Sequence, residues 1–112
     1  MTVEEMVAQL GLQVVTQGQW GQRVTGGYAS DMLSCVMARA KAGNVWVTLQ
    51  AHPNVVAVAS LLNLAAVVVT EGVEPDVETA MRAQENDVTL LRTPRNTFTV
   101  VGQLAALGVT GE

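Results

Sequence analysis

The chain has 112 residues, a usual length for one domain. Hydrophobic residues make up 49% of it and charged residues only 14%, which excludes an intrinsically disordered chain. The formal net charge is −4 and Lys41 is the only lysine. Nucleic-acid binding is not expected, because it requires grouped Lys and Arg side chains.

Cysteine content and hydropathy indicate a protein of the cytoplasm. Cys35 is the only cysteine, so neither an intrachain disulfide nor a cysteine-rich metal site is expected. The most apolar stretch, residues 55–69, contains polar residues and is shorter than the roughly 20 residues that span a bilayer. Glu4 and Glu5 stand where a secretory signal would have basic residues. We therefore expect no association with a membrane.

The first expected element is a helix. Thr2 and Glu5 have the spacing of a capping box, and apolar residues repeat at helical spacing from Val3 to Leu10. Gly11 can end this helix. A short strand over residues 12–16, a loop and an extended segment over residues 23–29 should follow.

The rest of the chain alternates helices and strands. Ser30 is the expected N-cap of a helix, Asn54 the N-cap of a second with Pro53 at its entry, and Asn96 the N-cap of the last. The expected helices are 31–41, 54–64, 76–85 and 96–107, and the expected strands are 45–49, 66–70 and 88–91. Short connections between them predict right-handed crossovers and parallel strands. The prediction is one α/β domain over residues 1–112, with three α/β/α layers and a mostly parallel sheet of about five strands.

The helix expected over residues 54–64 has almost no polar face. A surface helix normally shows one. Either neighbouring helices cover it on both sides, or its outer side is buried in an oligomer. The second interpretation is favoured because a small domain has much surface to cover. We therefore expect a homo-oligomer, with a dimer as its form.

Polar residues follow three apolar runs, and in a parallel sheet these strand ends share the carboxyl edge, where such folds bind ligands. Helix N-termini at this edge favour anions, and an arginine fork suits phosphate or carboxylate. Alternatively, the hydroxyls and amides cap helices, and each arginine is solvated or pairs with Glu71 or Glu74. The candidate ligand-binding residues are Asp31, Thr48, Gln50, His52, Asn54, Thr70, Glu71, Arg92, Arg95 and Thr97.

Signals for catalysis are weak. The chain has neither a phosphate-binding Gly-x-x-x-x-Gly-Lys-Ser/Thr loop nor a Gly-x-Gly-x-x-Gly motif, so it is not expected to be a kinase. His52 is the only histidine, and no nucleophile elbow accompanies it. His52 with Glu71 and Asp31 matches no metal-ligand spacing, and a turn-forming role before Pro53 explains it as well. No catalytic residue, metal or cofactor is predicted.

Four runs of the sequence resemble the DRTGG-domain family: residues 26–37, 44–59, 67–76 and 91–98. This family is similar to the N-terminal domain of bacterial HPr kinase/phosphorylase and to a module found beside CBS domains and in some phosphotransacetylases. The resemblance implies a layered α/β/α fold, a regulatory or accessory role and frequent oligomerisation. It implies no kinase activity, which belongs to a separate P-loop domain.

The chain also departs from the family pattern at two places. Residues 50–52 stand where the family has an Asp-Arg pair, and Thr70-Glu71-Gly72 stands where it has Thr-Gly-Gly. Thr70 is therefore the residue of this chain that best matches the family pattern.

Three functions follow from these observations. The favoured one is a stand-alone regulatory module that senses a small, possibly anionic ligand or docks on a partner as a homo-oligomer. The alternatives are a purely structural interaction domain, with the apolar helix as its contact, and a small enzyme that uses His52.

Overall fold

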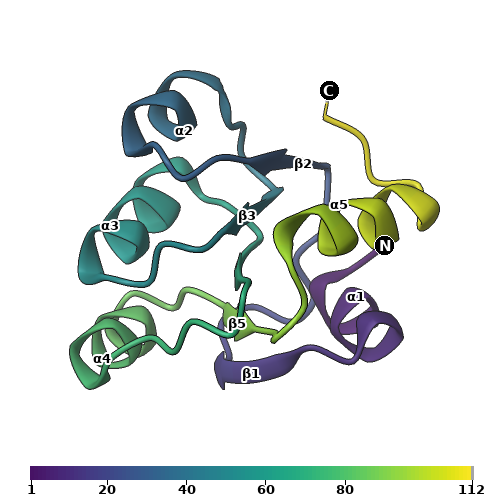
Figure 1. Cartoon of the computed structure of the whole chain (residues 1–112). Coiled ribbons are helices and arrows are strands. Elements are labelled where there is room, and N and C mark those ends of the chain that lie inside the picture. Colours follow the sequence, from purple (N-terminus) through teal and green to yellow (C-terminus); the bar gives the residue numbers. More distant parts are fainter. Residues whose placement is uncertain (112) are drawn as a thin grey trace.

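The computed structural model of the chain describes residues 1–111 and consists of five helices and five strands (Figure 1). The helices are α1 (Val3–Leu10), α2 (Leu33–Arg39), α3 (Pro53–Leu62), α4 (Val77–Glu85) and α5 (Thr97–Ala106). The strands are β1 (Gln13–Thr16), β2 (Gly26–Ala29), β3 (Asn44–Thr48), β4 (Ala66–Val69) and β5 (Leu90–Arg92). No helix within the described residues has the length and apolar character needed to cross a membrane.

The strands form one sheet in the order β1-β5-β4-β3-β2. The four strands from β2 to β5 are parallel, and β1 runs antiparallel to β5 at one edge. In the central register, Val47 of β3 lies beside Val68 of β4, which lies beside Leu91 of β5. These pairings confirm the predicted α/β fold with a mostly parallel sheet of five strands.

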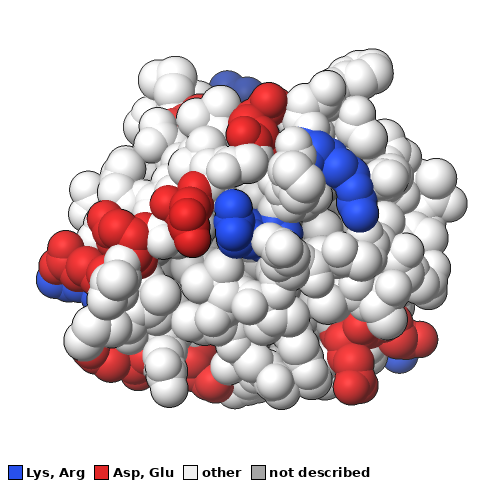
Figure 2. Space-filling model, turned by 60° about the horizontal axis from the view of Figure 1, so that its bottom comes forward, with Lys and Arg blue, Asp and Glu red and all other residues white. Residues whose placement is uncertain are grey.

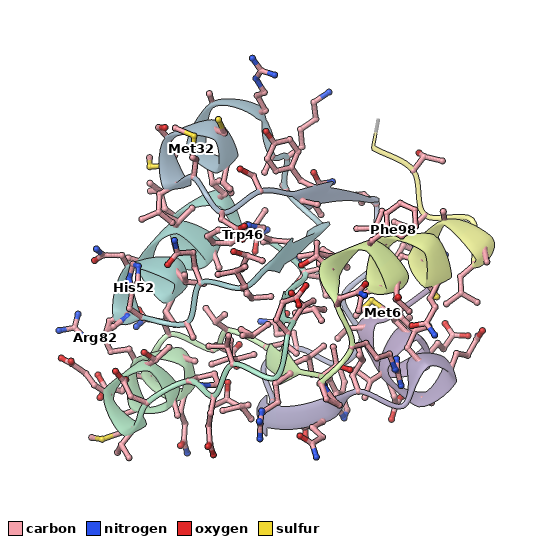
Figure 3. The ribbon with its side chains drawn as sticks, viewed as in Figure 1. Met6, Met32, Trp46, His52, Arg82 and Phe98 are labelled. Atoms are coloured by element: carbon pink, nitrogen blue, oxygen red, sulfur yellow. The ribbon has the colours of Figure 1, made fainter. Side chains whose placement is uncertain are left out.

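Helices cover both faces of the sheet, so the molecule has three layers (Figure 1). Alternate residues of a strand point to opposite faces. Val45 and Val47 of β3 therefore pack in one core with α1 and α5, whereas Trp46 packs in the other with α2, α3 and α4. Met6 and Trp46 mark the two cores (Figure 3).

The caps of two helices differ from the prediction. Ser30 does not cap α2: its hydroxyl accepts a hydrogen bond from the Met32 amide, and α2 begins at Leu33. Asn54 does not cap α3, because that helix begins at Pro53 with His52 in the N-cap position. Proline suits this first position because it needs no acceptor for an amide hydrogen.

The caps of α1 and α5 are as predicted. Thr2 and Glu5 form a capping box, and Gly11 ends α1 with a positive φ of 62° that glycine adopts easily. The Asn96 side chain accepts a hydrogen bond from the Thr99 amide at the start of α5.

The apolar character of α3 has an explanation within one chain. The helix lies between α2 and α4 (Figure 1) and buries Val55, Val56, Val58 and Ala59. Its large exposed apolar side chain is Leu61, which is 70% exposed. The structure thus agrees with the interpretation that neighbouring helices cover α3, and the oligomer remains a separate expectation.

Candidate functional site

The carboxyl ends of the parallel strands meet at one edge, where the end of β3 is held by Asp31. Thr48 is fully buried, and its hydroxyl donates a hydrogen bond of 2.8 Å to Asp31 Oδ1. The Leu49 amide donates to the same oxygen at 2.9 Å. The loop before α2 is therefore fastened to the end of β3 by one carboxylate.

Gln50 closes this cluster. Its amide donates to Thr48 Oγ1 at 3.1 Å, and its side-chain Nε2 donates to the Asp31 carbonyl at 3.2 Å. The structure therefore brings Asp31, Thr48 and Gln50 together at this edge, where they hydrogen-bond to one another.

Thr70 joins the neighbouring strand to helix α5. It is fully buried, and its amide donates to the Thr48 carbonyl at 3.0 Å. The hydroxyl oxygens of Thr70 and Thr97 lie 2.7 Å apart, and either can be the donor. The resemblance singled out Thr70, and the structure places it at the centre of the carboxyl edge.

Glu71 supplies an anion at the N-terminus of α5. Its Oε2 accepts a hydrogen bond of 2.8 Å from the Thr97 amide, and its own amide donates to the Arg95 carbonyl. A carboxylate is favourable there because the amides of the first helical turn carry partial positive charge. At the position where the sequence predicted a ligand anion, the chain thus places its own carboxylate.

The backbone at Glu71 has a conformation that suits glycine, the residue that the resemblance implies at this position. Glu71 has a φ of 63° and Gly72 a φ of 73°, both in the left-handed region that glycine adopts without strain. Glu71 keeps this conformation although it has a Cβ atom. Its amide and carboxylate hydrogen bonds hold it there.

The two candidate arginines differ in their contacts. The guanidinium of Arg95 donates to the Leu10 carbonyl at 2.6 Å and to Gln103 Oε1 at 3.0 Å, so it ties the end of α1 to α5. Arg92 Nη1 lies 4.0 Å from Glu74 Oε1, and the buried Nε of Arg92 has no hydrogen-bond partner among the described residues.

His52 and Asn54 lie apart from these clusters. Both are exposed at the start of α3, and His52 makes no capping hydrogen bond with its side chain (Figure 3). Within residues 1–111, no group of three or more His, Cys, Asp or Glu side chains is placed to hold a metal ion.

Hydrogen bonds link the ends of β3 and β4 to the loop before α2 and to the start of α5. The principal hollows of the surface are lined by other residues, and Arg92 is the one predicted site residue that lines any of the five. On the face shown in Figure 2, acidic and basic side chains are scattered over a largely uncharged surface. That face has no basic patch.

A second surface, on α5, was missed by the sequence reasoning. Helix α5 contains no charged residue, and its Phe98 is 88% exposed. A hollow of about 590 Å³ lies beside it, lined by Gly27, Tyr28, Ala29, Val47, Val101, Leu104, Ala105, Val109, Thr110 and Gly111. The absence of charge from residues 97–106 was a signal that could have indicated this surface.

Comparison with known proteins identifies the family of this chain. The model of the DRTGG domain matches residues 5–107. The chain belongs to the DRTGG-domain family. Among the curated proteins, none matches this DRTGG domain significantly.

A solved structure is similar to this DRTGG domain. It contains the CBS and DRTGG domains of the regulatory region of Clostridium perfringens pyrophosphatase, complexed with its activator diadenosine tetraphosphate. The TM-score is 0.71 at 17% sequence identity, and the match covers 90% of the present chain. It spans 44% of the other chain, so the likeness concerns the fold of less than half of that protein.

Proposed function

We propose that this DRTGG domain is a regulatory or accessory module without a catalytic reaction of its own, which acts as a homodimer. Family membership supports the regulatory role, because the related domain belongs to the regulatory region of a pyrophosphatase. The observation that carries the dimer is the uncharged outer side of α5.

The outer side of α5 has a self-complementary shape. Phe98, Val101, Gly102 and Ala105 are all exposed and follow helical spacing, so they lie on one side of the helix. In an antiparallel pair of α5 helices related by a twofold axis, Phe98 of each copy lies opposite Ala105 of the other. Val101 then lies opposite Gly102, so large side chains meet small ones.

The hollow beside α5 can receive the aromatic ring. Ala105 lines it together with Leu104 and Tyr28, and Ala105 is the residue that faces Phe98 of the other copy in this arrangement. Aromatic side chains that fill a partner's pocket carry much of the binding energy in protein interfaces.

Charge favours a second copy as the occupant. Two molecules with a net charge of −4 repel each other, so they associate best through a surface without charge. None of the residues that line the hollow is charged, and neither is any residue of α5. An acidic or basic partner would find no complementary charge there.

The test is the molar mass in solution, measured by size-exclusion chromatography with light scattering at micromolar concentration. We expect a dimer for the natural sequence and a monomer for Phe98→Asp. Leu61→Asp is the matched control, because Leu61 is a similarly exposed apolar residue on α3. This control should remain a dimer.

Each other outcome contradicts the α5 dimer. A natural chain that is monomeric removes the proposal altogether. A dimer that Leu61→Asp dissociates and Phe98→Asp does not would place the contact on α3, as the sequence reasoning first favoured.

A regulatory module also needs a signal, and we propose that the signal is a small anionic ligand. The activator of the related regulatory region is an anionic dinucleotide, which supports this class of ligand for a domain of the same family. Thermal-shift measurements with nucleotides, acyl phosphates and small carboxylates test it. If none of these raises the melting temperature, the domain is a purely structural module.

A further inference from the structure

We infer that a hollow beside β1 is the binding site for the oxyanion of a small ligand, held by Arg92. This Arg92 hollow has a volume of about 440 Å³ and is lined by Gln13, Val14, Val15, Glu74, Pro75 and Arg92. The inference rests on the proposed response to a small anion and is independent of the dimer.

The sheet fixes the position of Arg92. It is the last residue of β5, paired with Val69 of β4 on one side and with Gln13 of β1 on the other. Leu90, two residues earlier, packs in the core with α3 and α4, so the Arg92 side chain starts on that face. The side chain is 27% exposed, which leaves little freedom for the guanidinium.

The guanidinium of Arg92 has N–H donors without an acceptor. Its Nε is buried without a hydrogen-bond partner, and no hydrogen bond within residues 1–111 uses any of its N–H groups. A buried polar group without a partner is unfavourable, and such groups are rare in native proteins. Arg95, in contrast, uses both of its Nη atoms in hydrogen bonds.

Glu74 does not satisfy Arg92. The closest approach of the two side chains is 4.0 Å, too long for a hydrogen bond, and the Glu74 side chain is 79% exposed. Exposed ion pairs of this kind hold their partners weakly. A ligand oxyanion can therefore take the place of the Glu74 carboxylate and accept two parallel hydrogen bonds from the guanidinium fork.

The other lining residues indicate the class of ligand. Val14, Val15 and Pro75 offer an apolar wall, and the Gln13 amide adds one neutral donor. With one arginine and one nearby carboxylate, the hollow suits a single oxyanion better than a chain of phosphates. We therefore assign it to a small ligand that carries one carboxylate or one phosphate on an apolar body.

Titration of the whole ¹⁵N-labelled chain with phenyl phosphate and with benzoate tests the assignment. The two probes share an apolar ring and differ in the oxyanion, so their relative affinities separate phosphate from carboxylate ligands. At constant ionic strength, we expect saturable NMR shifts of the Arg92 Nε–H and of the β1 amides. Arg92→Gln should weaken binding about tenfold or more, which is 1.4 kcal/mol or more, and Arg92→Lys should weaken it less.

Arg82→Gln is the control, because Arg82 is an arginine of α4 whose side chain is 57% exposed. It should bind the probes like the natural chain. If Arg82→Gln and Arg92→Gln weaken probe binding equally, in variants whose spectra show the native fold, the loss comes from the net charge of the chain. That outcome would overturn the site. Shifts that saturate elsewhere would overturn the Arg92 hollow and leave the small-anion response standing. No saturable shift with either probe would contradict the assignment itself.

Discussion

At the scale of single residues, Glu71 combines an unfavourable backbone conformation with a favourable contact. Its φ of 63° lies where a residue with a Cβ atom is strained, and its carboxylate accepts a hydrogen bond from the first amide of α5. The two effects oppose each other in the stability of the fold. Substitutions can separate them.

We predict that Glu71→Gly is more stable than Glu71→Ala by about 1 kcal/mol, because only glycine adopts this conformation freely and both variants lose the carboxylate. Glu71→Gln, which keeps an acceptor and loses the charge at the helix terminus, should be less stable than the natural chain by about 0.3–1 kcal/mol. Urea denaturation gives these differences. Equal stability of the Gly and Ala variants would show that the backbone at Glu71 is not strained.

At the scale of elements, the chain order of helices and strands could be predicted because apolar runs and turn signals alternate regularly. The antiparallel direction of β1 could not, because residues 12–16 carry an apolar pattern that is the same in either direction. The neighbours of α3 could not be predicted either, because the sequence of an apolar helix is the same whether other helices or a second chain cover it.

The sequence predicted which residues meet at the carboxyl edge but not the hydrogen bonds they make there, and ligand binding at this edge stays a prediction. Thr48, Thr70 and Thr97 come together because parallel strands end at a common edge. That Asp31 and Glu71 provide acceptors at this edge could not be predicted, because both hydrogen bonds depend on tertiary structure and link residues 17 and 26 positions apart. The same bonds explain why Asp31 belongs to a loop rather than to the first turn of α2.

The loop that joins β2 to α2 depends on Asp31. We predict that Asp31→Ala lowers the free energy of unfolding by about 1–3 kcal/mol, because it leaves the buried Thr48 hydroxyl and the Leu49 amide without their acceptor. Asp31→Asn keeps an oxygen at this position and should lose less. Urea denaturation of both variants measures the difference. A loss of equal size in both would mean that the charge, and not the hydrogen bonds, holds the loop.

At the scale of the whole molecule, the stability of the fold should depend on pH through the caps of two helices in different layers. Hydrogen bonds from the amide and hydroxyl of Thr2 hold the pKa of Glu5 below its usual value of 4.5. Hydrogen bonds from the amide and hydroxyl of Thr79 likewise hold the pKa of Asp76 below 3.8. In both helices, the folded state therefore favours the ionised carboxylate.

The direction of the pH effect follows from these lowered pKa values. The unfolded chain binds protons to both carboxyl groups at a higher pH than the folded chain does, so acid favours unfolding. The stabilisation is complete above the ordinary pKa values and is lost as the pH falls below about 5 and through the folded pKa values. We predict that the urea concentration at the unfolding midpoint decreases as the pH is lowered from 6 to 3. In Glu5→Gln/Asp76→Asn, this midpoint should be lower than that of the natural chain at pH 6, and it should decrease less toward pH 3.

The matched control for this prediction is Glu4→Gln/Glu85→Gln. It removes the same two charges from the same two helices at exposed positions and leaves both caps intact. If the caps cause the effect, the urea midpoint of the control should decrease as much as that of the natural chain. General repulsion among charges changes equally in the two double variants, so it cannot account for a difference between them. A fall that is the same in the cap variant and in the natural chain would assign the acid sensitivity to other carboxylates.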